Sequence, residues 1–335
     1  MLVPNVLVTM RFTEAQLDRL RRVSPSLSVT CADAERADYS GVDVLYAGAP
    51  PRDLARAPAL KWVQLHMAGV NALYDHPLYT KSALPLTTTS GVHAATIAEY
   101  ALAVMLALAH RVPRMVEWQA RGGWPPDARR WELFVPTELR GATLGIIGYG
   151  SIGRELARMA TSALGMRVVA LKRDPSRRAD PDYCPPGTGD PEGSLPELWL
   201  GPDGLPELLE IADVVVMAAP LTPATRGMIG AAALARMKPS AYFINVGRGA
   251  SVDEAALAQA LRARRIAGAA VDVFAEEPPP ADHPLYACDN VIVSPHVSGF
   301  LPSYDDRCAD LFAENLRRWL AGAPLLNLVD RARGY

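Results

Sequence analysis

Three side chains with complementary chemistry follow apolar runs of the sequence. Arg248 comes after the run at residues 242–246, and His296 comes after the run at 291–294, with Glu277 between them. If such runs are parallel strands of one sheet, their carboxyl ends share an edge, beyond which ligands bind. An arginine, a carboxylate and a histidine there are what the reduction of a 2-keto acid needs. Arg248 would bind the substrate carboxylate and polarise the carbonyl. His296 would donate a proton to the forming alkoxide, while Glu277 favours its charged form and fixes its tautomer.

Each of these residues also has a plainer interpretation. Arg248 stands between two glycines, where it is poorly placed for core packing, so its alternative is a surface position. Glu277 precedes three prolines and could simply be solvated. Of the six histidines, only His296 directly follows a predicted strand of this sheet, which favours it as the acid.

A glycine-rich turn could hold the second reactant. The apolar run at residues 144–147 leads into Gly148, Gly150 and Gly153, in GxGxxG spacing, and then into helix-forming residues. Gly148 would allow a tight turn, Gly150 a close approach of the backbone to a pyrophosphate, and Gly153 close packing of helix on strand. The phosphates would sit at the helix N-terminus, which favours anions. A packing turn is the alternative, but the flanking strand and helix favour a dinucleotide site.

The elements that must position these residues alternate along the chain. A first, smaller α/β unit contains a helix at 13–22, with Thr13 and Gln16 as a capping box. Its predicted strands lie at 6–8, 27–30, 42–46, 62–65 and 86–89. With the glycine-turn strand, a second set forms a doubly wound parallel sheet, because parallel strands require crossover helices. This second set lies at 168–171, 214–217, 242–246, 269–273 and 291–294.

Four connecting segments carry further expectations. A small-residue turn at 66–71 is predicted either to present backbone N–H groups to an anion or to be a plain strand-to-helix turn. A long helix from about residue 94 is expected to break at 121–126. Trp124 and Trp131 then lie in an irregular segment, to be buried against another subunit or within the chain.

The two remaining segments lie beyond the glycine turn. Residues 175–206 are rich in proline, glycine and aspartate, which predicts a long surface loop. The last helix, at about 303–320, is expected to return to the first unit.

Composition bounds the function. The 335 residues suffice for about two domains, and 50% hydrophobic with 21% charged residues is typical of globular proteins. A net charge of −2 argues against nucleic acid as a partner. We expect no signal peptide and no membrane span, since no apolar stretch reaches about 18 residues. The four cysteines have no metal-ligand spacing, so we expect no metal, no disulfide and a cytoplasmic location.

Four motifs together resemble the D-2-hydroxyacid dehydrogenase family, and in particular its glyoxylate/hydroxypyruvate reductase-like members. They are the glycine turn, residues 246–249, residues 271–274 with Glu277-Pro278, and residues 294–299, within a resemblance that spans about 62–299. The resemblance implies a Rossmann-type dinucleotide-binding domain at 101–299 and a smaller flavodoxin-like α/β substrate domain at 1–100 with 300–335. It implies hydride transfer between NAD(P)(H) and a small 2-keto acid or D-2-hydroxy acid, in a homodimer joined through the nucleotide domains.

The resemblance also implies residue roles. Arg248 would bind the substrate carboxylate and carbonyl, His296 would be the acid/base and Glu277 its partner. A turn at Met67, Ala68 and Gly69 would bind the substrate carboxylate through backbone N–H groups. The implied cofactor contacts are Gly148, Tyr149, Gly150, Ser151, Ile152, Lys172, Arg173, Pro220, Thr225, Val246, Gly247, Asp272 and Gly299.

The sequence departs from the NAD pattern after the second strand of the nucleotide sheet. NAD enzymes usually carry an aspartate there to bind the ribose 2′-OH. Here the strand runs into Lys172 and Arg173, and Asp174 lies beyond the expected position. Two cations suit a 2′-phosphate, so we predict NADP in preference to NAD. The alternative is a solvated basic loop beside an NAD site.

Two other functions fit the same motifs. A nucleotide-sensing dimeric binding protein, such as the corepressors of this family, would keep the fold and the same three side chains. Formate or phosphite oxidation is an alternative within the enzyme class. The intact Arg248, Glu277 and His296, together with the lack of long disordered tails in this sequence, favour the 2-keto acid reductase.

Overall fold

Two parallel sheets carry the predicted strands. The computed structural model describes residues 3–335 and divides the chain into two units. Unit 1 comprises Met1–His93, Pro181–Pro185 and Leu301–Tyr335, and unit 2 comprises Ala94–Asp180 and Pro186–Phe300. The division predicted from the sequence lay at 100/101 and 299/300. The unit-1 segment Pro181–Pro185 lies inside the stretch that the sequence assigned to the nucleotide domain.

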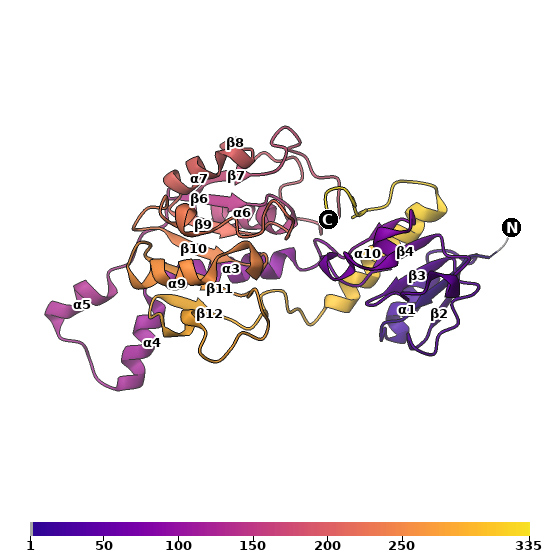
Figure 1. Ribbon diagram of the computed structural model, residues 1–335, viewed down its shortest axis with the longest axis horizontal. Helices are drawn as coiled ribbons and strands as arrows, with labels where there is room; N and C mark the ends of the chain where they lie inside the picture. Colours follow the sequence, from indigo (N-terminus) through magenta and orange to yellow (C-terminus); the bar gives the residue numbers. More distant parts are fainter. Residues whose placement is uncertain (1–2) are drawn as a thin grey trace. The chain divides into compact units, whose positions relative to one another are not determined.

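The sheet of unit 2 has seven strands in the order β12-β11-β10-β9-β6-β7-β8, all parallel (Figure 1). Read from β8 to β12, and with the glycine-turn strand β6 numbered 1, this order is 3-2-1-4-5-6-7. It is the Rossmann order with one added strand, and it confirms the predicted doubly wound fold. Its strands are β6 (Thr143–Ile147), β7 (Arg167–Leu171), β8 (Leu198–Leu200), β9 (Val214–Met217), β10 (Tyr242–Asn245), β11 (Gly268–Val271) and β12 (Val291–Val293).

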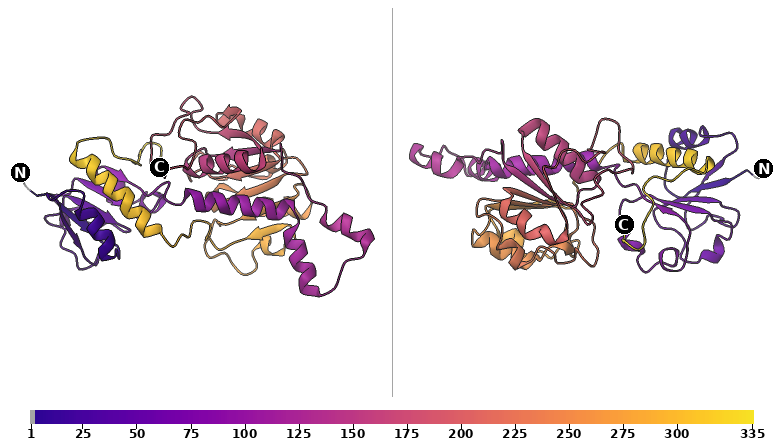
Figure 2. Two further views of the ribbon diagram at one scale, coloured as in Figure 1. Left: turned by 180° about the vertical axis from the view of Figure 1, so that it is seen from behind. Right: turned by 90° about the horizontal axis from the view of Figure 1, so that it is seen from above.

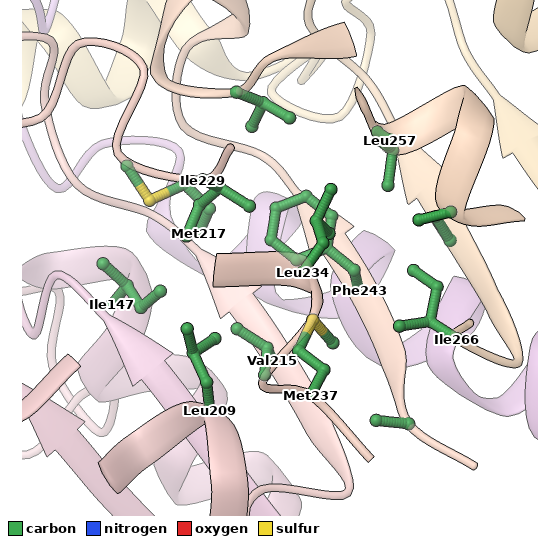
Figure 3. Close-up of a cluster of buried hydrophobic side chains, with 14 of the residues drawn as sticks. Ile147, Leu209, Val215, Met217, Ile229, Leu234, Met237, Phe243, Leu257 and Ile266 are labelled. Carbon is green, nitrogen blue, oxygen red and sulfur yellow. The ribbon is translucent and has the colours of Figure 1, made fainter. Parts of the chain in front are cut away.

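Helices cover both faces of this sheet, as the view from above shows (Figure 2). One face packs against α3 (Ala94–Ala109) and α6 (Ser151–Leu164). The other packs against α7 (Leu205–Ile211), α8 (Ala231–Leu234) and α9 (Glu254–Arg262). Figure 3 shows strand side chains interleaving with helix side chains on this second face. Because the strands are buried on both faces, their sequences are near-continuous apolar runs. The side chains labelled in Figure 3 are Ile147, Leu209, Val215, Met217, Ile229, Leu234, Met237, Phe243, Leu257 and Ile266.

The sheet of unit 1 has five parallel strands in the order β2-β1-β3-β4-β5, the flavodoxin-like order expected. They are β1 (Asn5–Val8), β2 (Ser28–Cys31), β3 (Val44–Ala47), β4 (Trp62–Leu65) and β5 (Leu86–Thr87). One face packs against α1 (Glu14–Arg21) and α10 (Tyr304–Leu320), so the last helix does return to the first unit. Arg19 joins the two helices by ion pairs with Asp306 and Asp310. The predicted capping box of Thr13 and Gln16 is present.

The other face of this sheet packs against short helical turns that include α2 (Pro77–Thr80). His76 caps α2: its Nδ1 accepts a hydrogen bond from the Leu78 N–H at 3.1 Å, and its Nε2 lies 3.2 Å from the Pro50 carbonyl oxygen. This arrangement fixes the neutral tautomer with the proton on Nε2. Burial lowers the pKa of His76. If Nδ1 were also protonated, its N–H would face the Leu78 N–H, and two donors cannot form a hydrogen bond. The cap therefore requires the neutral ring.

The segment at 175–206 differs from the surface loop predicted. Its last part forms β8, which pairs with β7 and extends the sheet of unit 2 by one strand. Its middle part belongs to unit 1, where the Asn327 side chain accepts a hydrogen bond from the Tyr183 N–H and donates to the carbonyls of Thr88 and Ser90. Proline and glycine content correctly indicated irregular backbone but not these attachments.

An arm of two helices extends from unit 2 (Figure 1). The helix predicted to run to about residue 121 breaks earlier, at Arg111, whose φ of 57° is left-handed. It is followed by α4 (Val112–Arg121) and α5 (Asp127–Phe134). Trp131 therefore lies in a helix, not in irregular chain, and Trp131 and Trp124 are 79% and 78% exposed. Burial of the two tryptophans within the same chain was thus a wrong alternative.

Within residues 3–335 no single helix is long and apolar enough to cross a membrane, although α3 and α4, bent by 64°, pass that test as a pair. Half of the residues of α3 are buried, and Ala98 and Met105 are among those that belong to the core of unit 2.

Candidate active site

The glycine turn lies between β6 and α6, and each glycine has a distinct reason to lack a side chain. Gly148 has a φ of +97°, and a Cβ there would lie 2.6 Å from the Ala219 backbone. A Cβ on Gly153 would lie 2.6 Å from the Gly148 carbonyl oxygen. At Gly150 a Cβ would meet nothing within 4 Å, so the space beside this residue is open. The turn is therefore closed by packing at two glycines and open at the third.

The open glycine is also the N-cap of α6, and no side chain caps the helix there. The first backbone N–H groups of the helix, including those of Ser151 and Ile152, are thus available to an anion. These features fit a pyrophosphate. Tyr149 turns its side chain away: it is buried, and its hydroxyl donates to Asp190 at 2.7 Å. Any contact of Tyr149 with a dinucleotide would come through its backbone.

Two cations follow the next strand, β7. Arg173 is exposed, and Lys172 is partly buried with its Nζ donating to the Arg177 carbonyl at 2.7 Å. Burial, with a smaller contribution from the nearby Arg154 cation, lowers the pKa of Lys172. Arg154 is itself buried and binds Asp180 at 3.2 Å, together with the Asp190 carbonyl. The segment that follows Lys172 is thus fastened to α6.

The loop after β9 carries Pro220 and Thr225. The Thr225 hydroxyl donates to the Pro220 carbonyl at 2.7 Å and accepts from the Thr222 N–H at 2.8 Å. It therefore closes its own turn. A role of these two residues in cofactor binding stays a prediction.

Arg248 projects from a tightly built loop after β10. The Asn245 side chain accepts from the Gly247 N–H at 3.1 Å and donates to the Arg248 carbonyl at 3.3 Å. A Cβ on Gly249 would overlap the backbone of Phe274, so this loop touches the loop after β11. The half-buried guanidinium donates to the Gly247 carbonyl at 2.7 Å. Val246 and Gly247, which precede Arg248, are buried.

Glu277 and His296 are brought together by the structure. The Nδ1 atom of His296 lies 2.7 Å from Oε2 of Glu277, and the other carboxylate oxygen accepts from the Phe274 N–H at 2.9 Å. The side chains of His296 and Glu277 are 52% and 37% exposed, so the pair is open to solvent. With Nδ1 bound to the carboxylate, Nε2 is the ring nitrogen left to exchange a proton with a substrate.

Asp272 supports the loop that carries His296. Its fully buried carboxylate accepts from the Ser294 hydroxyl at 2.5 Å, the Val297 N–H at 3.0 Å and the Ser298 N–H at 3.1 Å. The Ser294 hydroxyl is also 2.6 Å from that of Tyr100 on α3. Asp272 was predicted as a cofactor contact, and its carboxylate is already occupied by these loop donors. Gly299 ends the same loop and is partly exposed.

The predicted substrate turn lies in unit 1, after β4. Met67, Ala68 and Gly69 are partly exposed, and the carbonyls of His66 and Met67 accept hydrogen bonds from Thr89, which follows β5. The other predicted site residues all lie in unit 2.

Several residues that shape these loops were not predicted. Asn245 and Ser294 each stand at the end of a strand, which is the signal that could have found them. Glu254 and His283 form a second glutamate–histidine pair at 3.2 Å beside Phe274, and nothing in the sequence pattern marks them as partners.

A doubly wound parallel sheet with an open glycine turn at its carboxyl edge is typical of dinucleotide-binding proteins, many of them oxidoreductases. The comparisons with known proteins give the family. Residues 102–298 match the protein family described as "D-isomer specific 2-hydroxyacid dehydrogenase, NAD binding domain". The chain belongs to that family, and it transfers a hydride between a nicotinamide dinucleotide and a 2-hydroxy or 2-keto acid.

Relatives and solved structures support the same assignment. The chain is 36% identical over 285 residues to a glyoxylate reductase of Aeropyrum pernix, covering 83% of this chain and 78% of that one. It is 33% identical over 283 residues to a glycerate dehydrogenase of Methylorubrum extorquens, covering 83% and 81%. A D-isomer specific 2-hydroxyacid dehydrogenase of Xanthobacter autotrophicus Py2, crystallised with NADPH and MES, is 31% identical with a TM-score of 0.80 and coverage of 99% and 100%. An NADPH-dependent glyoxylate/hydroxypyruvate reductase of Sinorhizobium meliloti, in complex with NADP and sulfate, is 26% identical with a TM-score of 0.77 and the same coverage.

Proposed function

We propose that the protein is an NADP(H)-dependent reductase of small 2-keto acids such as glyoxylate or hydroxypyruvate. The observation that carries the proposal is the 2.7 Å contact between His296 and Glu277 at the carboxyl edge of a dinucleotide-binding sheet. The names of the relatives, among them glyoxylate reductases, support this substrate class.

The roles of the side chains follow from the contacts. When bound, the nicotinamide supplies the hydride for C2 of the substrate. His296 donates its Nε2 proton to the oxygen that becomes the alcohol, and Glu277 holds the ring in the orientation and tautomer that leave Nε2 as the donor. The Arg248 guanidinium binds the substrate carboxylate and polarises the adjacent carbonyl.

The turn at Met67, Ala68 and Gly69 supplies backbone donors for a substrate carboxylate. Backbone N–H groups in a turn form an anion-binding concavity without a charged side chain. The Gly150 turn and the N-terminus of α6 bind the pyrophosphate of the cofactor.

Lys172 and Arg173 give the cofactor preference. We propose that they bind the 2′-phosphate of NADP, because each is a cation placed directly after β7 and no carboxylate occupies those two positions. The test compares kcat/KM for NADPH and NADH in the wild type and in the Arg173→Ala variant. The variant should lose about tenfold or more with NADPH and little with NADH, since hydrogen bonds to charged groups contribute about 1.5–3 kcal/mol. Arg167→Ala, at the opposite end of the same strand, is the control and should change neither value. A wild-type preference for NADH would contradict the proposal.

The function itself is tested with a substrate panel. Glyoxylate, hydroxypyruvate, pyruvate and bulkier 2-keto acids are offered with each reduced cofactor, and formate and phosphite with each oxidised cofactor. Reduction of the smallest 2-keto acids with the highest kcat/KM is the expected result. Activity confined to formate or phosphite, or none with any compound, would refute it.

We also propose that the protein is a cytoplasmic homodimer joined through α4 and α5. The exposed Trp124 and Trp131 lie on this arm with Met115 and Val116, which are also exposed. Large apolar side chains grouped on a protruding arm suit burial against a second copy. All four cysteines are free, as a reducing compartment favours. Light scattering after gel filtration should give twice the chain mass for the wild type, and a smaller mass for a Trp124→Ser, Trp131→Ser variant. A monomeric wild type would refute the dimer.

A further inference from the structure

The turn after β4 is held by its carbonyl groups. The Tyr304 hydroxyl donates to the His66 carbonyl oxygen at 2.6 Å, and the Thr89 hydroxyl donates to the same oxygen at 2.9 Å. The two hydroxyls are 3.0 Å apart, so both face one acceptor. The Thr89 N–H donates to the next carbonyl, that of Met67, at 3.1 Å. Three donors thus fix two successive peptide groups.

Fixing these carbonyls also orients the N–H groups of the turn. In a trans peptide the N–H points opposite to the C=O of the same plane. The carbonyls of His66 and Met67 share their planes with the N–H groups of Met67 and Ala68, which must therefore point away from Tyr304 and Thr89. Across residues 3–335, neither of these two N–H groups has a hydrogen-bond acceptor in the protein. They are oriented donors without an internal partner.

Tyr304 is itself rigidly placed. It is the first residue of α10, and its ring packs edge-on against His66, with centroids 5.1 Å apart, and stacks on His93 at 5.3 Å. Burial raises the pKa of the Tyr304 phenol. The hydroxyl therefore stays protonated, and remains a donor, across the pH range of an enzyme assay.

We propose that Tyr304 is a positioning residue for substrate binding. It orients the peptide groups of Met67 and Ala68 so that their N–H groups meet the carboxylate of the 2-keto acid, and Thr89 shares this task. Tyr304 does not contact the reacting atoms and acts only through the turn. The inference rests on the proposed role of that turn.

The test is the Tyr304→Phe variant, which removes one hydroxyl and keeps the ring and its packing. At saturating NADPH, the KM for glyoxylate should rise about fivefold, the equivalent of one hydrogen bond of about 1 kcal/mol. The kcat and the KM for NADPH should stay at the wild-type values. The inhibition constant of oxamate, a carboxylate analogue that is not reduced, should rise in step with the KM. Thr89→Val, which removes the other hydroxyl, should give the same split.

Tyr79→Phe is the matched control. The Tyr79 hydroxyl also donates to a backbone carbonyl in unit 1, that of Arg331 at 3.0 Å, but lies outside the turn. Its loss should leave the KM for glyoxylate unchanged. Equal KM values for wild type and Tyr304→Phe would overturn the inference and leave the reductase function standing, as would an equal rise in Tyr79→Phe or a fall in kcat alone. A wild type that reduces no 2-keto acid would overturn both.

Discussion

Replacing Glu277 by glutamine tests the acid–base pair without changing its shape. The carboxylate accepts two hydrogen bonds, from the Phe274 N–H at 2.9 Å and from His296 Nδ1 at 2.7 Å. Both neighbours are donors. A glutamine amide has one acceptor oxygen and one NH2 donor, so it satisfies one neighbour and opposes the other. Either His296 loses its orienting partner or the loop at Phe274 shifts.

The magnitude follows from the type of bond and its exposure. A hydrogen bond to a charged group contributes about 1.5–3 kcal/mol. The two side chains are 52% and 37% exposed, so screening by solvent reduces this to about 1–2 kcal/mol. Since about 1.4 kcal/mol is tenfold in rate, the kcat of Glu277→Gln for reduction should be about 5- to 30-fold below the wild type. The loss falls on kcat because His296 transfers its proton in the transition state.

The assay is the steady-state oxidation of NADPH at saturating glyoxylate and neutral pH. Glu254→Gln is the matched control, because Glu254 also accepts from a backbone N–H, that of Ala275 at 2.7 Å, and contacts a histidine, His283, at 3.2 Å. It should lower the melting temperature but leave kcat close to the wild-type value. A Glu277→Gln enzyme with wild-type kcat, or one no slower than Glu254→Gln, would refute the reasoning.

Four further variants test the acid, the glycine turn and the pH dependence of stability. His296→Ala should lower kcat about 10²- to 10⁴-fold, and retained turnover in steady-state assays would reject it as the acid. Gly153→Ala should lower the free energy of unfolding by about 1–3 kcal/mol through overpacking. Gly150→Ala should leave the melting temperature unchanged and raise the KM for NADPH. The opposite pattern would contradict the assigned roles. Because burial lowers the pKa of His76, the unfolded chain binds a proton more readily, so the free energy of unfolding should fall as pH drops below about 6.5. His66 shifts in the same direction, so urea unfolding of His76→Asn should show a shallower decline but not a flat one, and an unchanged slope would exclude His76 as a contributor.

The strands could be predicted because burial on both faces leaves a simple sequence signal. Trp62–Leu65 and Val214–Met217 have the predicted bounds, and the parallel pairing of the strands follows from their alternation with helices. The strand β8 could not be found in this way. Leu198–Leu200 is only three residues long and stands in a segment rich in proline and glycine. Its strand conformation comes from pairing with β7 and not from its own pattern.

In the candidate site, the residues at strand ends could be predicted from the sequence, but the residues that support them could not. The meeting of Glu277 and His296 follows from strand ends at one edge of a sheet. The supports of such residues could not be predicted, because hydrogen bonds to loop backbone depend on conformations that side-chain types do not specify. Asp272 shows this, since its carboxylate is used by the loop of His296. Tyr304 shows it more strongly, since 215 residues separate it from the Thr89 hydroxyl that it meets.

The interleaving of the two units along the chain has a consequence for biosynthesis. All of unit 2 has been synthesised when the ribosome passes Phe300, whereas unit 1 still lacks α10. That helix supplies Phe312 and Leu316 to the core of unit 1, and both are fully buried there. The sheet translated first is therefore the one completed last, because one of its faces lacks the cover of α10 until that helix emerges. During synthesis, we expect the apolar side chains on that face to be exposed for longer than those of unit 2, and such exposure promotes aggregation.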